Sequence, residues 1–167
     1  AAVDWLAPRL FPPKPGKDMT PESDEPDMKT AAKAEPPSKP EPTQLTGHTI
    51  LIGYGRVGSI IADALAASAQ PFLVVEDAEA LLAKLRERDV EVVAGNAARA
   101  DVLKAANPAG ARFLLIAIPE AFEAGQIVQQ ARAANPAIRI IARAHSDAEV
   151  DHLKSLGADL VIMGERE

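Results

Sequence analysis

An apolar run that closes on three glycines restricts the possible folds of this chain more than any other feature. Residues Ile50–Ser59 read ILIGYGRVGS, so Gly53, Gly55 and Gly58 have the spacing G-x-G-x-x-G. In a strand–loop–helix unit with this spacing, the first glycine makes a sharp turn, the second leaves room for a pyrophosphate, and the third allows close helix packing. The helix N-terminus then offers N–H groups to phosphate oxygens. We predict a nucleotide-binding loop; a glycine-rich turn that serves packing alone is the alternative.

The residues between the glycines belong to the same predicted site. Arg56 lies inside the loop and could add a charge-assisted contact to a phosphate. Tyr54 and Val57 complete the loop and are included with it.

Short apolar runs alternate with helical patterns along the rest of the chain. Strands are predicted at 49–53, 71–76, 90–96, 111–118, 137–144 and 158–163. Helices are predicted at 57–69, 79–89, 98–107, 120–135 and 146–157, the last with Ser146 as N-cap and Glu149 at the capping-box position. This alternation predicts an α/β, doubly wound, Rossmann-type sheet of six parallel strands with helices on both faces. The fourth, fifth and sixth strands are apolar enough that we expect both of their faces to be covered.

The first 46 residues have a different composition, and we divide the chain into 1–46 and 47–167. Ten of the fourteen prolines precede Gly47, and residues 11–44 are charged and poor in branched apolar side chains. Such a stretch buries too little apolar surface to fold, so we expect a largely disordered linker. Residues 5–11 carry a tryptophan and an arginine among apolar side chains, which fits either an ordinary helix end or the last turn of a membrane-adjacent helix. The chain begins with Ala1, and we interpret it as a piece of a longer protein.

Composition excludes several classes of function. The net charge is -6 and the charges are mixed, which argues against a nucleic-acid surface because phosphate backbones need a clustered basic face. The absence of cysteine excludes disulfides, thiolate nucleophiles and cysteine metal sites. We expect no metal site and no catalytic residue, because His48, His145 and His152 form no recognisable catalytic or metal-binding pattern.

A carboxylate ends the second predicted strand, where a ribose-binding acid is expected. Glu76 lies 23 residues after Gly53 and could accept hydrogen bonds from both adenosine ribose hydroxyls, with Asp77 as the second candidate. A carboxylate also repels a 2′-phosphate, and no basic residue follows until Lys84. NAD, NADH or a simple adenine nucleotide is therefore favoured over NADP; a solvated acid at a strand end is the alternative.

Two further strand ends complete the predicted site. Asn96 and Ala97 follow the third strand, and an amide can both donate to and accept from an adenine edge, although Asn96 could instead be a helix N-cap. Ile118 and Pro119 follow the fourth strand at the topological switch point, where ligands lie across such sheets.

Residues 47–167 resemble the TrkA-N domain, the nucleotide-binding half of RCK (regulator of potassium conductance) units. The resemblance rests on HTILIGYGRVGSIIADAL, LRERDVEVVAGNAA and IIARAHSDAEVDHLKSLGADLVIMGERE, and is greatest to Kef-type monovalent cation:proton antiporters of the YbaL-like branch. It implies a cytoplasmic regulatory domain at the inner membrane that binds NAD(H) or AMP and gates cation:proton antiport by a linked transmembrane domain. It also implies a homodimer in the full-length protein, with residues 1–46 leading from the last membrane helix.

The chain departs from the family pattern at two positions. Many members have aspartate where this chain has Glu76, and a G-D-A sequence where it has Asn96. The family's crossover helix would lie beyond Glu167, so dimerisation of this chain does not follow from the resemblance. Glutathione control is not carried over either, because its ligand residues have no match here. The alternatives to a regulatory domain are the cofactor-binding part of an NAD-dependent oxidoreductase and an assembly module with an empty pocket.

Overall fold

Six parallel strands form one sheet in the computed structural model, which describes residues 39–164. The strands are β1 (Thr49–Ile52), β2 (Phe72–Glu76), β3 (Glu91–Ala94), β4 (Phe113–Ile116), β5 (Arg139–Ala144) and β6 (Leu160–Met163). Their order is β3-β2-β1-β4-β5-β6, and every neighbouring pair is parallel. The predicted doubly wound sheet is therefore confirmed, and its switch point lies between β1 and β4.

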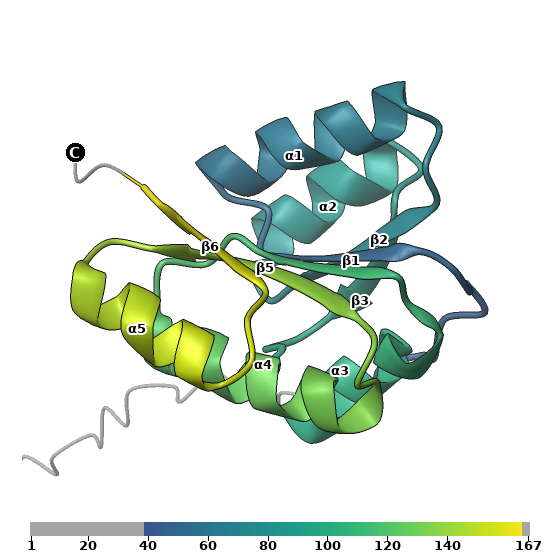
Figure 1. Cartoon of the computed structure of the whole chain (residues 1–167). Helices are drawn as coiled ribbons and strands as arrows, with labels where there is room; N and C mark the ends of the chain where they lie inside the picture. The colour runs from purple at the N-terminus through teal and green to yellow at the C-terminus, as the bar shows by residue number, and fades with distance from the viewer. Residues whose placement is uncertain (1–38, 165–167) are drawn as a thin grey trace, which may run out of the picture. The chain divides into compact units, whose positions relative to one another are not determined.

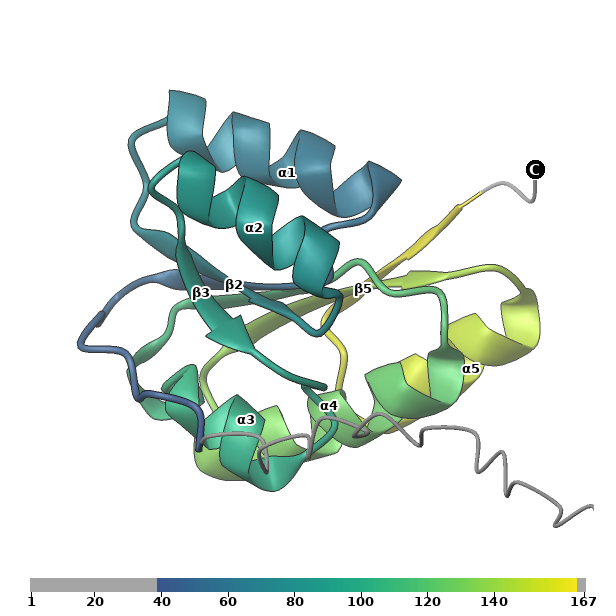
Figure 2. The same ribbon diagram turned by 180° about the vertical axis from the view of Figure 1, so that it is seen from behind.

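Helices cover both faces of the sheet, with the first two on one face and the last three on the other. They are α1 (Arg56–Ala67), α2 (Glu79–Glu87), α3 (Ala100–Ala105), α4 (Ala121–Ala134) and α5 (Asp147–Ser155), with a 3₁₀ turn η1 at Pro108–Gly110. The helices α1 and α2 lie on one face, and α3, α4 and α5 lie on the other (Figures 1 and 2). Right-handed crossovers produce this division, because the connection from β3 to β4 carries the chain to the opposite face.

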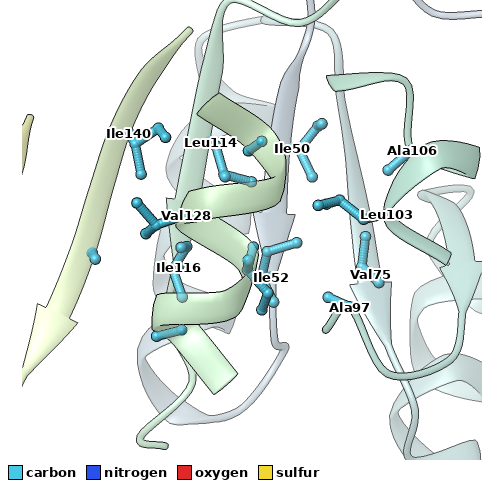
Figure 3. Packing of buried hydrophobic residues seen from close by; sticks show 14 of the residues in the cluster. Ile50, Ile52, Val75, Ala97, Leu103, Ala106, Leu114, Ile116, Val128 and Ile140 are labelled. Atoms are coloured by element: carbon cyan, nitrogen blue, oxygen red, sulfur yellow. The ribbon is translucent and has the colours of Figure 1, made fainter. Parts of the chain in front are cut away.

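Alternate residues of the strands build two apolar cores. Ile50, Ile52 and Leu114 point toward α3 and α4 and belong to the larger core (Figure 3). Leu51 and Val74 point the other way and pack with the smaller core under α1 and α2. The central strands β1 and β2 are thus buried on both faces, as expected for parallel strands in the middle of such a sheet.

The expectation that the fourth to sixth strands are covered on both faces is wrong for β6 and incomplete for its neighbours. Leu160, Ile162 and Met163 are 50%, 55% and 51% exposed. The helices α4 and α5 cover one face of β4–β6, whereas α1 and α2 lie beside β1–β3 on the other (Figure 1). Among residues 39–164, no helix therefore covers the α1 side of the β5–β6 edge.

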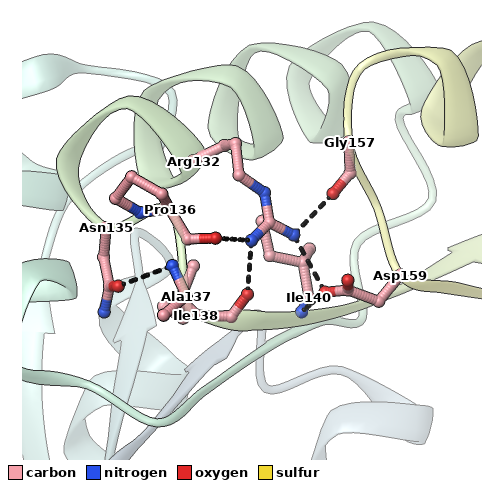
Figure 4. Close-up of polar contacts among 8 residues, drawn as sticks. All are labelled: Arg132, Asn135, Pro136, Ala137, Ile138, Ile140, Gly157 and Asp159. Atoms are coloured by element: carbon pink, nitrogen blue, oxygen red, sulfur yellow. Dashed lines mark hydrogen bonds and ion pairs between the residues drawn. The ribbon is translucent and has the colours of Figure 1, made fainter.

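The guanidinium of Arg132 bonds to the two segments that lead into β5 and β6 (Figure 4). Arg132, near the end of α4, donates to the carbonyl oxygens of Pro136 (2.8 Å), Ile138 (2.7 Å) and Gly157 (2.7 Å). It also pairs with Asp159 at 2.9 Å. The Ile140 amide and this guanidinium hold the pKa of the Asp159 carboxyl below its usual range.

The segment before β1 packs against the fold. The Thr43 amide donates to Ala105 O at 2.8 Å, and Asn107 Nδ2 donates to Leu45 O at 3.0 Å. His48 is fully buried, with Nε2 3.0 Å from Ala106 O, far from the carboxyl ends of the strands. The rest of the predicted linker, 1–38, and residues 165–167 lie outside the described residues. Within 39–164, every helix is too short or too polar to span a membrane.

Candidate functional site

A cavity of about 180 Å³ lies at the carboxyl ends of β1–β4. The predicted site residues that line it are Gly53, Glu76, Asp77, Asn96, Ala97, Ile118 and Pro119. Six lining residues were not predicted: Ile52, Val75 and Gly95 in or next to the strands, and Glu120, Glu123 and Ile127 at the start of α4. The helical spacing of Glu120, Glu123 and Ile127 was visible in the sequence, but only the structure shows that this helix face turns toward the switch point.

Two of the three loop glycines are explained by the fold itself. Gly53 has φ +88°, and a Cβ there would approach Ile118 Cγ2 to 2.8 Å. A Cβ on Gly58 would overlap the carbonyl oxygen of Gly53, so the third glycine allows α1 to pack against the loop. Both glycines are thus required by turn geometry and close packing.

Neither backbone conformation nor packing within the domain requires a glycine at position 55. Its φ of -70° suits any residue, and a Cβ there would meet nothing within 4 Å. It is the N-cap position of α1, and the first turn of that helix contains no acidic residue. The missing side chain therefore leaves open space beside N–H groups at a helix N-terminus, which is what a phosphate needs.

The other loop residues lie outside the cavity. The Tyr54 ring is only 6% exposed and belongs to the smaller core, and its hydroxyl accepts a hydrogen bond from Arg88 of the α2 C-cap. Arg56 is exposed at the start of α1. Val57 lines a different cavity on the α1 face of the sheet. The Tyr54 amide donates to Glu76, and this bond connects the loop to the cavity lining.

Glu76 connects the glycine loop to the loop after β2. Its side chain lines the cavity and is 9% exposed. Oε2 accepts from the Tyr54 amide at 2.7 Å, and Oε1 accepts from the amides of Asp77 and Ala78, each at 3.0 Å. A carboxylate offers about four lone-pair sites, so acceptor capacity remains for a ribose hydroxyl.

Asn96 joins two walls of the cavity. Its Nδ2 donates to Glu123 Oε1 at 3.1 Å, and its Oδ1 accepts from the Ala98 amide at 2.7 Å. The alternative prediction that Asn96 is the helix N-cap is wrong, because α3 begins at Ala100 and its N-cap is Arg99. The short loop after β3 forms its own turn before the helix starts.

Charge around the cavity favours an uncharged polar group. Four carboxylates line it, those of Glu76, Asp77, Glu120 and Glu123, and its lining contains no lysine or arginine. Hydroxyl and amino groups can donate to these acceptors, whereas a phosphate inside would face negative charge. The lining thus fits the base and ribose of a nucleoside, with phosphates outside at the α1 N-terminus.

The three histidines lie outside the cavity lining. His48 is buried at the opposite end of β1, His152 is exposed on α5, and His145 follows β5. The His145 amide donates to Glu149 Oε2 at 2.7 Å, so this carboxylate reaches one residue before the predicted N-cap Ser146. Within 39–164, no three His, Asp or Glu side chains are grouped to hold a metal ion.

Known proteins resemble this chain over nearly all of its described part. The family model for the TrkA-N domain matches residues 49–164. The putative cation/proton antiporter YbaL of Escherichia coli (strain K12) is 45% identical over 138 residues. These are 83% of this chain but 25% of YbaL, so the chain spans about a quarter of that relative.

Solved structures agree with this assignment. The TrkA-N domain of inner membrane protein YbaL from Escherichia coli matches with a TM-score of 0.71 at 45% identity, covering 73% of this chain and 90% of that one. The Shewanella denitrificans Kef CTD in AMP-bound form matches with a TM-score of 0.62 at 29% identity, covering 70% of each chain. The GsuK channel bound to NAD shares the fold at 22% identity, with a TM-score of 0.67 over 77% of this chain and 23% of that one.

Proposed function

Since the chain belongs to the TrkA-N domain family, we propose that it is a regulatory domain that senses an adenine nucleotide, AMP or NAD(H), for a linked cation:proton antiporter. The proposal includes a position on the cytoplasmic face of the inner membrane and a homodimer in the full-length protein. The relatives support the family context: YbaL is named a cation/proton antiporter, and the Kef domain binds AMP.

The observation that carries the nucleotide proposal is the contrast among the three glycines. Gly53 and Gly58 are accounted for by backbone conformation and packing, whereas Gly55 leaves open space at the N-terminus of α1. The adjacent cavity offers apolar walls and carboxylate acceptors, which suit adenine and ribose. A nucleotide with its adenosine in the cavity and its phosphate at Gly55 would use both features.

Gating requires more than binding. A nucleotide shifts the equilibrium between two states of an assembly only if it binds them with different affinity. We therefore propose that the domain acts without catalysis, by differential binding. An oxidoreductase would need a substrate domain and a general acid or base beside the reacting ring, and no feature of the described cavity favours that alternative.

A thermal-shift titration with AMP, NAD, NADH and NADPH tests the proposal. Ligand at 100 times its dissociation constant should stabilise the native state by about 2.7 kcal/mol. We expect this with AMP or NAD(H) and little effect with NADPH, because the 2′-phosphate would face Glu76 and Asp77. Glu76→Ala should lower the affinity, whereas Glu87→Ala, an exposed carboxylate at the end of α2, should not. No shift with any nucleotide would contradict the proposal and favour an assembly module.

A further inference from the structure

One guanidinium joins three elements on the α1–α2 face of the sheet. Arg88, the C-cap residue of α2, donates from Nη1 to the hydroxyl of Tyr54 in the glycine loop. Its Nη2 donates to Asp63 Oδ1 on α1 at 2.5 Å. The helices α1 and α2 lie side by side on this face (Figures 1 and 2). Arg88 therefore holds the tip of the Tyr54 side chain in place against both helices.

Tyr54 is held at three points along its length. Its amide donates to Glu76 Oε2 at 2.7 Å, its ring packs in the smaller core, and its hydroxyl accepts from Arg88. The next residue, Gly55, has no side chain that restricts its own backbone. The backbone geometry at Gly55 thus depends on how firmly Tyr54 is held before it and α1 after it.

The Tyr54 side chain reaches from the loop toward the opposite edge of the sheet. The helix α2 starts after the carboxyl end of β2 and ends before the amino end of β3, so its C-cap lies away from the cavity. The hydroxyl of Tyr54 meets Arg88 at this end of α2. Because the aromatic ring is rigid, fixing its hydroxyl also restricts the backbone at its other end.

The side-chain contacts of Arg88 are not needed to hold the domain folded. The side chains of Arg88 and Asp63 are 43% and 61% exposed, and exposed ion pairs contribute little to the free energy of unfolding. The backbone N–H of Arg88 donates to the carbonyl oxygens of Leu85 and Arg86, so another side chain would keep this helix end. The Tyr54 ring keeps its apolar partners in the smaller core. A substitution at Arg88 therefore releases the loop and leaves the fold.

We propose that Arg88 is a positioning residue for the phosphate of an adenine nucleotide; this inference rests on the proposed function. Arg88 lies outside the lining of the nucleotide cavity and acts through Tyr54. It keeps the glycine loop in the orientation in which the N–H groups at the start of α1 point at a phosphate. A loop that is ordered before the ligand arrives gives higher affinity, because binding does not have to order it.

The effect is specific to the phosphate because the adenosine end of the site is built from other elements. Its walls come from the strand ends at Glu76, Asn96 and Ile118 and from the start of α4. We therefore expect Arg88→Met to weaken AMP binding about threefold to tenfold, the range for one hydrogen bond between protein groups, and to leave adenosine affinity unchanged.

Calorimetric titration with AMP and adenosine tests this expectation. Arg86→Met is the matched control, because Arg86 lies on the same helix and loses only its ion pair with Glu79. It should leave the affinity for both ligands unchanged. Urea unfolding of each variant shows that the domain is folded before it is titrated.

A double-mutant cycle tests the route through Tyr54. Tyr54→Phe keeps the buried ring and removes the hydroxyl, so it should weaken AMP binding about as much as Arg88→Met. The double variant should lose no more AMP affinity than either single variant, because both changes remove the same contact. Additive losses would overturn the assignment of Arg88 as acting through Tyr54.

The loop also offers a spectroscopic readout, because Tyr54 is the only tyrosine of the chain. Incorporated 3-fluorotyrosine gives a single fluorine resonance in an NMR spectrum. Arg88→Met should broaden this resonance in the free domain, since the ring is released, and AMP should sharpen it again. A resonance as sharp as that of the unmodified domain would contradict the release of the loop.

The binding results separate this inference from the proposed function. If the unmodified chain binds AMP, but Arg88→Met binds it equally well or loses adenosine affinity to the same extent, Arg88 does not position the phosphate and the nucleotide site stands. If the unmodified chain binds neither AMP nor adenosine, both proposals are overturned.

Discussion

Alanine substitutions of the three loop glycines separate packing from ligand binding. At Gly58 a new methyl group would overlap the carbonyl oxygen of Gly53, and neither backbone segment can move without shifting α1 from β1. We expect Gly58→Ala to lower the free energy of unfolding by about 3 kcal/mol or more. At Gly53 the strain of φ +88° and the contact with Ile118 should cost about 1–3 kcal/mol.

Gly55→Ala should behave differently because the methyl group would enter open space. Alanine is a poorer N-cap residue than glycine, which costs up to about 1 kcal/mol, but it loses less backbone entropy on folding, which returns about 0.4–1 kcal/mol. The free energy of unfolding should therefore change by less than about 0.5 kcal/mol. Binding should change more, since the methyl group takes the space of a phosphate; we expect AMP affinity to fall at least about tenfold, or 1.4 kcal/mol.

Urea unfolding and calorimetric titration with AMP and adenosine measure these effects. Adenosine is the control because it lacks the phosphate, and its affinity should survive Gly55→Ala. A loss of stability at Gly55 as large as that at Gly58 would mean that all three glycines serve packing. An unchanged AMP affinity, or an equal loss for adenosine, would refute the assignment of a phosphate to this position.

Three further predictions concern the polar contacts. Arg132→Met removes the donor to three carbonyl oxygens, so the free energy of unfolding, measured in urea, should fall by about 2 kcal/mol. Arg86→Met is the control: this exposed arginine loses only a surface ion pair with Glu79, which should cost less than about 1 kcal/mol. The pKa of Asp159 is lowered in the folded state, so its stabilising contribution is present above the ordinary value of 3.8 and is lost as the pH falls through the lower folded value. Urea unfolding should then show Asp159→Asn as destabilising at pH 7, with a difference from the unmodified chain that shrinks below pH 3.8; a constant difference would contradict the pairing. Asn96→Ala should weaken AMP binding, measured by calorimetry, about threefold to tenfold, because the hydrogen bond between Asn96 and Glu123 in the cavity wall is lost. Gln129→Ala, on the exposed face of α4, is the control and should leave AMP affinity unchanged.

The sheet was predictable because each strand and helix has a recognisable pattern in its own short stretch of sequence. The apolar runs around Ile50 and Leu73 are too short for helices, and Gly53 breaks the first of them where the strand ends. Parallel pairing then follows because strands and helices alternate along the chain, and two parallel strands need a crossover connection such as a helix between them. What could not be predicted is the coverage of β6, because the apolar sequence of Leu160–Met163 looks the same whether a helix lies above it or not.

The site was predictable in its strand ends and less so in its side-chain contacts. Glu76, Asn96 and Ile118 are placed at the cavity by their position after β2, β3 and β4, which the topology brings to one edge. The bond from Asn96 to Glu123 depends on the direction of α4 across the sheet, which no local pattern gives. Tyr54 lies in the predicted loop, but its ring turns into the smaller core because a large aromatic side chain is stabilised more by burial than by solvent.

The hydrogen bonds that Glu76 already makes limit how much it can add to the binding energy of a nucleotide. Its carboxylate already accepts three backbone N–H groups, so part of its hydrogen-bonding capacity is used before a ribose arrives. A further bond to a charged acceptor contributes about 1.5–3 kcal/mol at most, which alone gives only weak affinity. One of these bonds holds the Tyr54 amide, and with it the direction in which the glycine loop leaves β1. In the proposed site, Glu76 would therefore act on both halves of a nucleotide, directly on the ribose and, through the loop, on a phosphate beside Gly55.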